Sequence, residues 1–149
     1  MTVGDVCNRR IPTAAGTMTV HAAAKSMRTF DEPLLVVIDE RDGKRFAVGI
    51  VTERDFVAVV AHERDPRQLT LEDIMRPHPG FVTESDGIFD TVCWMRRNRL
   101  REVVVNSQTG TVLGIVSLDR LVESLADEIA EAVSSAPEER TMQGKHELH

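Results

Sequence analysis

The chain has 149 residues, of which 42% are hydrophobic and 28% are charged, a balance typical of a folded globular protein and not of a disordered one. The formal net charge of −6 at pH 7 disfavours the broad basic surface with which a protein neutralises the phosphates of a nucleic acid. The two cysteines, Cys7 and Cys93, are too few for a disulfide framework, and no apolar run approaches the length of a membrane span. We therefore expect a cytoplasmic protein that is neither exported nor held in a membrane.

The first half of the chain carries an ordered series of short periodic segments. The expected elements are, in chain order, a short helix at 3–7, a brief strand around Thr13, a helix at 20–28, a hairpin of strands at 33–39 and 46–51 that turns at Gly43, and a helix that begins at Thr52. After the short leading helix, this order is β-α-β-β-α.

The second half repeats the first. Thr2 aligns with Thr70 at an offset of 68 residues, and the offset falls to 65 after the hairpin turn. The corresponding elements are a helix at 71–75, a strand around Val82, a helix at 88–97, strands at 102–106 and 112–116 that turn at Gly110, and a helix that begins at Ser117. We assign the first repeat to residues 2–65 and the second to 66–125, with a linker at 61–68. Because neither copy alone buries much surface, we expect the two to pack together.

A short phrase occurs once in each repeat, as GIVTERDF at 49–56 and GIVSLDRL at 114–121. In the first phrase Thr52 is followed three residues later by Asp55, which is the signature of a helix cap. Local sequence alone favours this structural role. The amides of a helix start also attract phosphate, a nearby carboxylate accepts ribose hydroxyls, and Arg54 would add a charge-assisted contact to phosphate.

The repeated order of elements, the segment DIM at 73–75 and the phrase at 49–56 resemble the CBS domain, named for cystathionine β-synthase. Two in tandem resemble a Bateman module, and the resemblance covers residues 2–125. It implies an α/β (α+β) fold of two β-α-β-β-α repeats packed with pseudo-twofold symmetry. It also implies that Thr52 and Asp55 hold the phosphate and ribose of an adenosine nucleotide, and that the chain forms a homodimer.

The resemblance further implies an adenine pocket that uses the short first strand of the repeat. There Thr13 would contact the base, and the small side chain of Ala14 would leave room for a flat ring. Leu34 and Val36 would supply an apolar wall. The alternative for each of these residues is ordinary core packing.

The second repeat departs from the pattern. Ser117 keeps the hydroxyl, but Arg120 stands where the ribose-binding acid is expected, and a cation accepts no hydrogen bond from a ribose hydroxyl. Phe81 stands opposite Thr13, where its ring would fill the adenine space. We therefore expect one good nucleotide site, with a second cleft that is closed or that prefers an anion without ribose. Arg120 would then reach a phosphate held mainly in the first cleft.

Two further features allow more than one interpretation. The arginines at 96, 97, 99 and 101 form a basic cluster that is either a solvated helix end or an attractor of anions toward the cleft. Apolar residues recur every four positions from Leu121 to Val133, which predicts that the last helix continues past the repeat. We assign residues 126–149 to this extension and to a disordered tail, in which His146 and His149 are too few for a zinc site.

The leading hypothesis is a regulatory module that binds an adenosine nucleotide such as AMP, ADP, ATP, NAD or S-adenosylmethionine and acts on an unidentified protein partner. It requires no cofactor and no metal, and it has no catalytic residues. The first alternative is a protein-interaction module without a physiological small ligand, in which Thr52 and Asp55 serve only as a cap. An enzyme that uses Cys93 or the histidines is the weakest alternative, because the sequence contains no nucleophile–base spacing and no metal motif.

Overall fold

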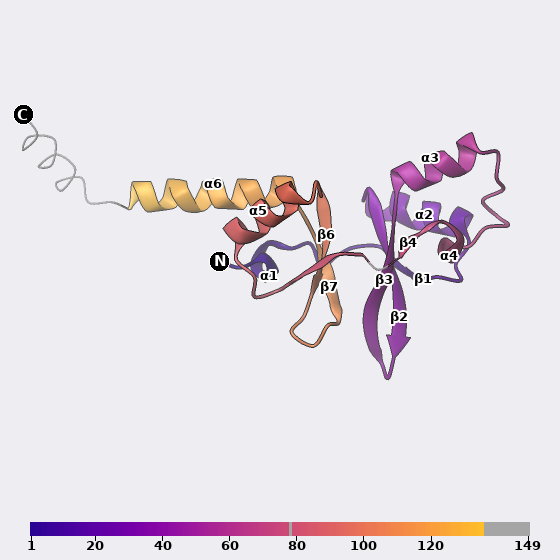
Figure 1. Cartoon of the computed structure of the whole chain (residues 1–149), viewed down its shortest axis with the longest axis horizontal. Coiled ribbons are helices and arrows are strands. Elements are labelled where there is room, and N and C mark those ends of the chain that lie inside the picture. The colour runs from indigo at the N-terminus through magenta and orange to yellow at the C-terminus, as the bar shows by residue number, and fades with distance from the viewer. Residues whose placement is uncertain (78, 136–149) are drawn as a thin grey trace, which may run out of the picture.

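A computed structural model describes residues 1–77 and 79–135. It contains the two expected β-α-β-β-α series, which form two units (Figure 1). The first unit contains β1 (Thr13–Ala15), α2 (Val20–Phe30), β2 (Leu34–Arg41), β3 (Lys44–Thr52) and α3 (Glu53–Ala61). The second contains β5 (Phe81–Thr83), α5 (Ile88–Arg97), β6 (Glu102–Asn106), β7 (Val112–Ser117) and α6 (Leu118–Ser134).

Each unit is built on a small mixed sheet. In the first sheet β1 pairs in parallel with β2, and β2 pairs antiparallel with β3; in the second sheet β5, β6 and β7 pair in the same way. The register is also repeated, because Thr13 lies opposite Val36 in one sheet and Phe81 lies opposite Val104 in the other. The internal repeat of the sequence is thus a repeat of structure at the level of individual strand pairs.

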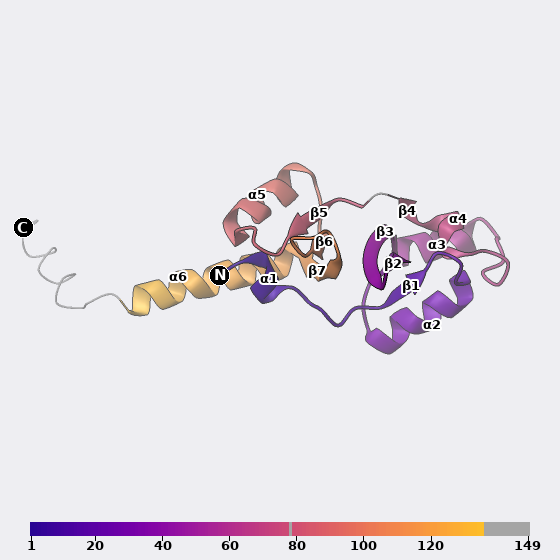
Figure 2. The same ribbon diagram turned by 90° about the horizontal axis from the view of Figure 1, so that it is seen from below.

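The leading segments of the two repeats are exchanged between the units (Figure 2). Helix α1 (Val3–Val6) belongs in sequence to the first repeat, but Val3 is fully buried in the core of the second unit. Helix α4 (Leu71–Ile74) belongs to the second repeat, but Leu71 is fully buried in the core of the first unit. This reciprocal exchange follows the pseudo-twofold symmetry and ties each repeat to the other.

The glycine of each repeated phrase lies where an exchanged segment crosses the sheet. Strand β4 (Arg76–Pro77) pairs with β3 at Gly49, and Asn8 forms a bridge with Ile115, the neighbour of Gly114. A Cβ on Gly114 would overlap the backbone carbonyl of Asn8, and a Cβ on Gly49 would overlap the side chain of Met75. Close approach of an exchanged segment therefore explains both glycines, through its backbone at Gly114 and through the Met75 side chain at Gly49.

A central apolar cluster lies between the two sheets. Strand β2 is buried on both faces, because Leu35 and Val37 enter the core of the first unit while Leu34 and Val36 enter the central cluster. The buried members of this cluster are Ile11, Leu34, Val36, Ile50, Val104 and Ile115. Fully burying one such side chain contributes about 1.5–3 kcal/mol, so the cluster fixes the placement of one sheet against the other.

Helix α6 continues past the second repeat, as the apolar spacing predicts, and extends away from both units (Figure 1). Its N-terminal half packs inward through Leu121, which is fully buried. Ile129 and Val133, farther along, are 59% and 70% exposed. The predicted tail, with His146 and His149, lies outside the described residues. Within 1–77 and 79–135, no helix has the length and apolar character needed to cross a membrane.

Candidate functional site

The first repeated phrase forms the junction between β3 and α3. Thr52 has extended backbone angles and precedes the helix, and the Asp55 side chain folds back onto it. The backbone N–H of Thr52 donates to Asp55 Oδ2 at 2.8 Å, and the Thr52 hydroxyl donates to the same oxygen at 3.2 Å. The predicted helix cap is therefore present.

The same cap occurs at two other helix starts. Asp5 accepts from the Thr2 N–H at 2.8 Å, and Asp73 accepts from the Thr70 N–H at 2.8 Å. In both cases the backbone hydrogen bond, with the hydroxyl as a second donor, lowers the pKa of the carboxyl group. A threonine–aspartate cap alone consequently does not mark a ligand site in this chain. Whether Thr52 belongs to a ligand site depends on the residues around it.

Thr52 opens onto a cleft of about 390 Å³, here called the first cleft. Its floor is apolar, because Leu34 and Ile50 from the ends of β2 and β3 line it. Among the residues that the structure describes, its lining is Pro33, Leu34, Ile50, Thr52, Glu53, Arg54, Arg76, Arg99, Leu100, Arg101 and Glu102. An apolar floor with convergent polar groups at a helix start is typical of a small-ligand site.

The equivalent phrase of the second repeat opens onto a second cleft of about 360 Å³. Its lining is Val6, Asn8, Glu32, Pro33, Glu102, Ile115, Val116, Ser117 and Arg120. Pro33 and Glu102 line both clefts, so the two adjoin. Arg120 thus lines the second cleft and not the first. A contact from Arg120 to a phosphate held in the adjoining first cleft stays a prediction.

The two clefts differ in charge. Four arginines and two glutamates line the first cleft, whereas Arg120 is the sole cation beside Glu32 and Glu102 in the lining of the second. Arg120 also lies 3.7 Å from Glu123, which partly neutralises it. Burial raises the pKa of Glu32, whose carboxylate accepts from the Asn8 amide at 2.7 Å. The first cleft therefore favours an anion and the second does not.

The remaining predicted ligand residues lie outside the first cleft. Thr13 lines a separate cavity of about 330 Å³, where its hydroxyl oxygen accepts from Arg45 Nη2 at 2.9 Å. Ala14 is buried in the core of the first unit, and Val36 lies in the central cluster with Leu34. Phe81 is 56% exposed and lines neither cleft, so its ring does not fill the second one.

Asp55 borders a different cavity, of about 410 Å³, between α3 and α4, together with His62 and Arg64. It is joined to the first cleft through its hydrogen bonds to Thr52. Among the described residues no group donates a hydrogen bond to its second oxygen, Oδ1. Ribose binding by Asp55 consequently remains a prediction, with one carboxylate oxygen available for it.

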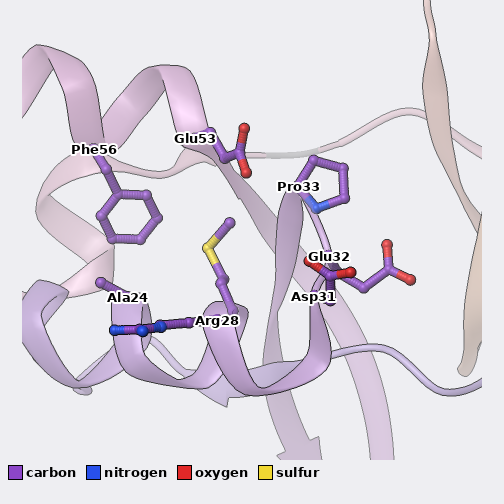
Figure 3. A pocket seen from close by; sticks show the side chains of 8 residues that line it. Ala24, Arg28, Asp31, Glu32, Pro33, Glu53 and Phe56 are labelled. Atoms are coloured by element: carbon purple, nitrogen blue, oxygen red, sulfur yellow. The ribbon is translucent and has the colours of Figure 1, made fainter.

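Another cavity of about 410 Å³ lies between α2 and α3 on the first unit (Figure 3). The side chains around it are Ala24, Met27, Arg28, Asp31, Glu32, Pro33, Glu53 and Phe56. Ala24 and Phe56 supply apolar surface, and a single arginine stands against three carboxylates. This cavity has an unfavourable charge for phosphate, unlike the first cleft.

The structure resolves the ambiguity of the basic cluster at 96–101. Arg99 and Arg101 line the first cleft, whereas Arg96 and Arg97 are exposed at the end of α5 and do not line it. Arg76 also lines the first cleft, and it was not among the residues predicted from the sequence. It follows helix α4, and only the exchange of leading segments places it beside the phrase of the other repeat.

Comparison with known proteins places this geometry in a family. The family model of the CBS domain matches residues 3–62 and matches again over residues 71–127. The chain belongs to the CBS domain family. Its two CBS repeats correspond to the β-α-β-β-α series described above, and the predicted fold and internal repeat are confirmed.

The chain is 28% identical over 124 residues to the uncharacterized protein MK0525 of Methanopyrus kandleri. That alignment covers 83% of this chain and 62% of the relative, so the chain spans less than two thirds of the relative's length.

Two solved CBS structures share the fold. The CBS domain pair of protein MJ0100, in complex with 5′-methylthioadenosine and S-adenosyl-L-methionine, is similar with a TM-score of 0.72 at 22% identity, covering 86% of this chain and 98% of that chain. The CBS domain protein PAE2072 from Pyrobaculum aerophilum, complexed with AMP, has a TM-score of 0.73 at 23% identity, covering 85% and 99% of the two chains.

Proposed function

We propose that this CBS pair binds an adenosine nucleotide in the first cleft and acts as a regulatory module without catalytic activity of its own. The observation that carries the proposal is the meeting of the Thr52 helix start with four arginines over an apolar floor. In this assignment Thr52 and Arg54 hold a phosphate, Asp55 accepts from the ribose, and Leu34 and Ile50 lie beneath the base. The adenosine ligands of MJ0100 and PAE2072 support the same class of ligand.

Regulation would follow from the way the first cleft is assembled. Thr52 and Arg54 come from the first repeat, whereas Arg99 and Arg101 come from the second. A ligand that contacts both repeats binds most tightly when they hold one relative pose, and this differential affinity allows a ligand to shift a conformational equilibrium. A protein partner would bind one relative pose of the two repeats more tightly than the other, and would thereby respond to the ligand. Both cysteines are free thiols, and we propose the cytoplasm as the location.

We further propose that the chain forms a homodimer through its helices. Val57 and Val60 on α3 are 66% and 74% exposed, and Phe89 on α5 is 62% exposed. Large apolar side chains gathered on helix surfaces favour association with another protein surface. A second copy of the chain satisfies this requirement without any other partner.

A protein-interaction module without a small ligand is the second candidate. The observation in its favour is that the caps at Thr2 and Thr70 have the geometry of the cap at Thr52. On this account the carboxylate of Asp55 only stabilises α3. The two candidates differ in whether the chain binds a nucleotide and in whether binding depends on Asp55.

The test is a thermal-shift and calorimetry panel of AMP, ADP, ATP, NAD and S-adenosylmethionine with the wild type, Asp55→Ala and Asp73→Ala. Asp73 is a matched control, because it forms the same cap with Thr70, which does not line the first cleft, whereas Asp55 is hydrogen-bonded to Thr52, which does. We expect Asp55→Ala to abolish ligand binding and Asp73→Ala to retain it. Binding that survives Asp55→Ala unchanged would show that the site is misplaced. If no nucleotide binds at submillimolar concentration, the nucleotide-binding proposal fails and the interaction module becomes the leading candidate.

A further inference from the structure

Within the described part of the chain, the arginines of the first cleft form no ion pair. Among the residues that the structure describes, ion pairs within 4.0 Å join the N-terminus to Glu128, Arg41 to Asp39, and Arg120 to Glu123. Arg54, Arg76, Arg99 and Arg101 are all exposed and take part in none of them. Glu53 and Glu102 also line this cleft, but neither lies within 4.0 Å of an arginine, and the four guanidinium groups outnumber the two carboxylates. The excess positive charge is stabilised by a bound anion.

These arginines approach the cleft from different elements. Arg54 belongs to the first turn of α3, beside Thr52, whereas Arg76 lies in β4. Arg99 and Arg101 lie in the loop between α5 and β6. The four side chains therefore reach the cleft from α3, from β4 and from the loop between α5 and β6, so more than one segment of the chain can contact a bound anion.

The number of cations exceeds what one phosphate requires. A phosphate monoester carries about −1.5 to −2 charges at pH 7, and the start of α3 together with Arg54 is sufficient to bind it. Arg76, Arg99 and Arg101 then remain for further phosphate groups. On the basis of the proposed function, we propose that the first cleft selects adenosine nucleotides with two or three phosphates over the monophosphate, and that Arg99 and Arg101 make this distinction.

The second cleft provides an internal contrast. It has the same place in its repeat, but Glu32 and Glu102 outnumber its single arginine, and that arginine faces Glu123. A nucleotide with several phosphates is repelled there. The selectivity therefore predicts one such nucleotide per chain, bound in the first cleft alone.

The test compares AMP, ADP and ATP by isothermal titration calorimetry on three proteins: the wild type, Arg99→Gln/Arg101→Gln and Arg96→Gln/Arg97→Gln. The second double variant is a matched control, since it removes the same charge from exposed positions next in sequence that do not line the cleft. Each charge-assisted contact changes affinity by about tenfold. We expect the wild type to bind ADP and ATP at least about tenfold more tightly than AMP.

We expect the preference to disappear in Arg99→Gln/Arg101→Gln and to persist in the control pair. Increasing ionic strength should weaken ATP binding more than AMP binding. The ion pairs between phosphate groups and the exposed arginines are screened by salt, and ATP forms more of them. Equal affinity of the wild type for AMP and ADP would overturn the selectivity and leave the proposed function intact. A preference that survives in Arg99→Gln/Arg101→Gln would overturn the role of these two residues. Absence of binding by all three nucleotides would overturn the selectivity, and it would reject the proposed function only if NAD and S-adenosylmethionine also fail to bind.

Discussion

Asp55 Oδ2 lies 2.8 Å from the backbone nitrogen of Thr52 and 3.2 Å from its hydroxyl oxygen, so the carboxylate closes the first turn of α3. At the equivalent positions the second repeat keeps only one half of this capping box. The backbone N–H of Arg120 donates to the Ser117 hydroxyl oxygen at 3.1 Å, and no side chain returns to the Ser117 backbone. One substitution thus removes both the reciprocal cap and the acid that the ribose would need.

Replacing Arg120 by aspartate should restore the reciprocal cap on α6. An acid in the first turn interacts favourably with the helix dipole, whereas Arg120 interacts unfavourably. The lost ion pair with Glu123 is exposed at 3.7 Å and contributes little. We expect Arg120→Asp to raise the free energy of unfolding by about 0.5–1 kcal/mol, measured by urea denaturation. Glu123→Gln is the control for the ion pair, and an unchanged or lower stability of Arg120→Asp would contradict the account.

The two phrase glycines should differ in their tolerance of alanine. A Cβ at position 114 meets the backbone carbonyl of Asn8, which paired hydrogen bonds to Ile115 of 2.8 and 3.0 Å hold in place. A Cβ at position 49 meets the flexible side chain of Met75. Overpacking typically lowers the free energy of unfolding by about 1–3 kcal/mol. We expect the loss for Gly114→Ala to lie near the upper end of this range and the loss for Gly49→Ala near the lower end.

Chemical denaturation of both glycine variants measures this difference. Met75→Ala should rescue Gly49→Ala in a double-mutant cycle, because it removes the overlapping atoms. Equal losses of stability in the two glycine variants, without rescue, would show that the exchanged segments do not cross at these residues.

Arg99 lines the first cleft and has a backbone conformation that is unfavourable for a residue with a side chain. Its φ of 56° lies in the left-handed region, which costs a residue with a side chain about 1–2 kcal/mol. We expect Arg99→Gly to raise the free energy of unfolding by about 1 kcal/mol and to weaken nucleotide binding. Glu63 has the same φ of 56° but does not line the first cleft, so Glu63→Gly should raise stability without changing affinity. Unchanged affinity of Arg99→Gly would remove this residue from the site.

The proposed homodimer predicts that α3 contributes to the interface. We expect the wild type to sediment as a dimer and Val57→Lys/Val60→Lys to sediment as a monomer in analytical ultracentrifugation. Because both side chains are largely exposed in the single chain, the variant should still fold. Gln108→Lys adds charge on the exposed turn between β6 and β7 and should remain dimeric. A monomeric wild type would refute the homodimer.

The order of elements was predictable because it depends on local patterns. Helical spacing predicted α5 at its observed bounds, and the continuous apolar run in β2 is typical of a strand buried on both faces. The hydroxyl residues Thr52 and Ser117 marked the starts of α3 and α6. These features require only near neighbours in sequence.

The residues that line the first cleft were harder to predict from the sequence. Arg76 reaches the first cleft only because the leading segments exchange, and this exchange depends on contacts between residues far apart in the chain. Ala14 and Val36 are small or apolar residues that suit either a pocket wall or a core. Their side chains face cores because of the strand pairing, which the sequence does not specify.

The most direct test of the central claim is a crystal structure of the chain grown with ADP. The account predicts one nucleotide per chain in the first cleft, with ribose hydroxyls hydrogen-bonded to Asp55 and the phosphates beside Thr52, Arg99 and Arg101. A nucleotide bound in the second cleft while the first is empty, or a first cleft without ligand at saturating ADP, would contradict it.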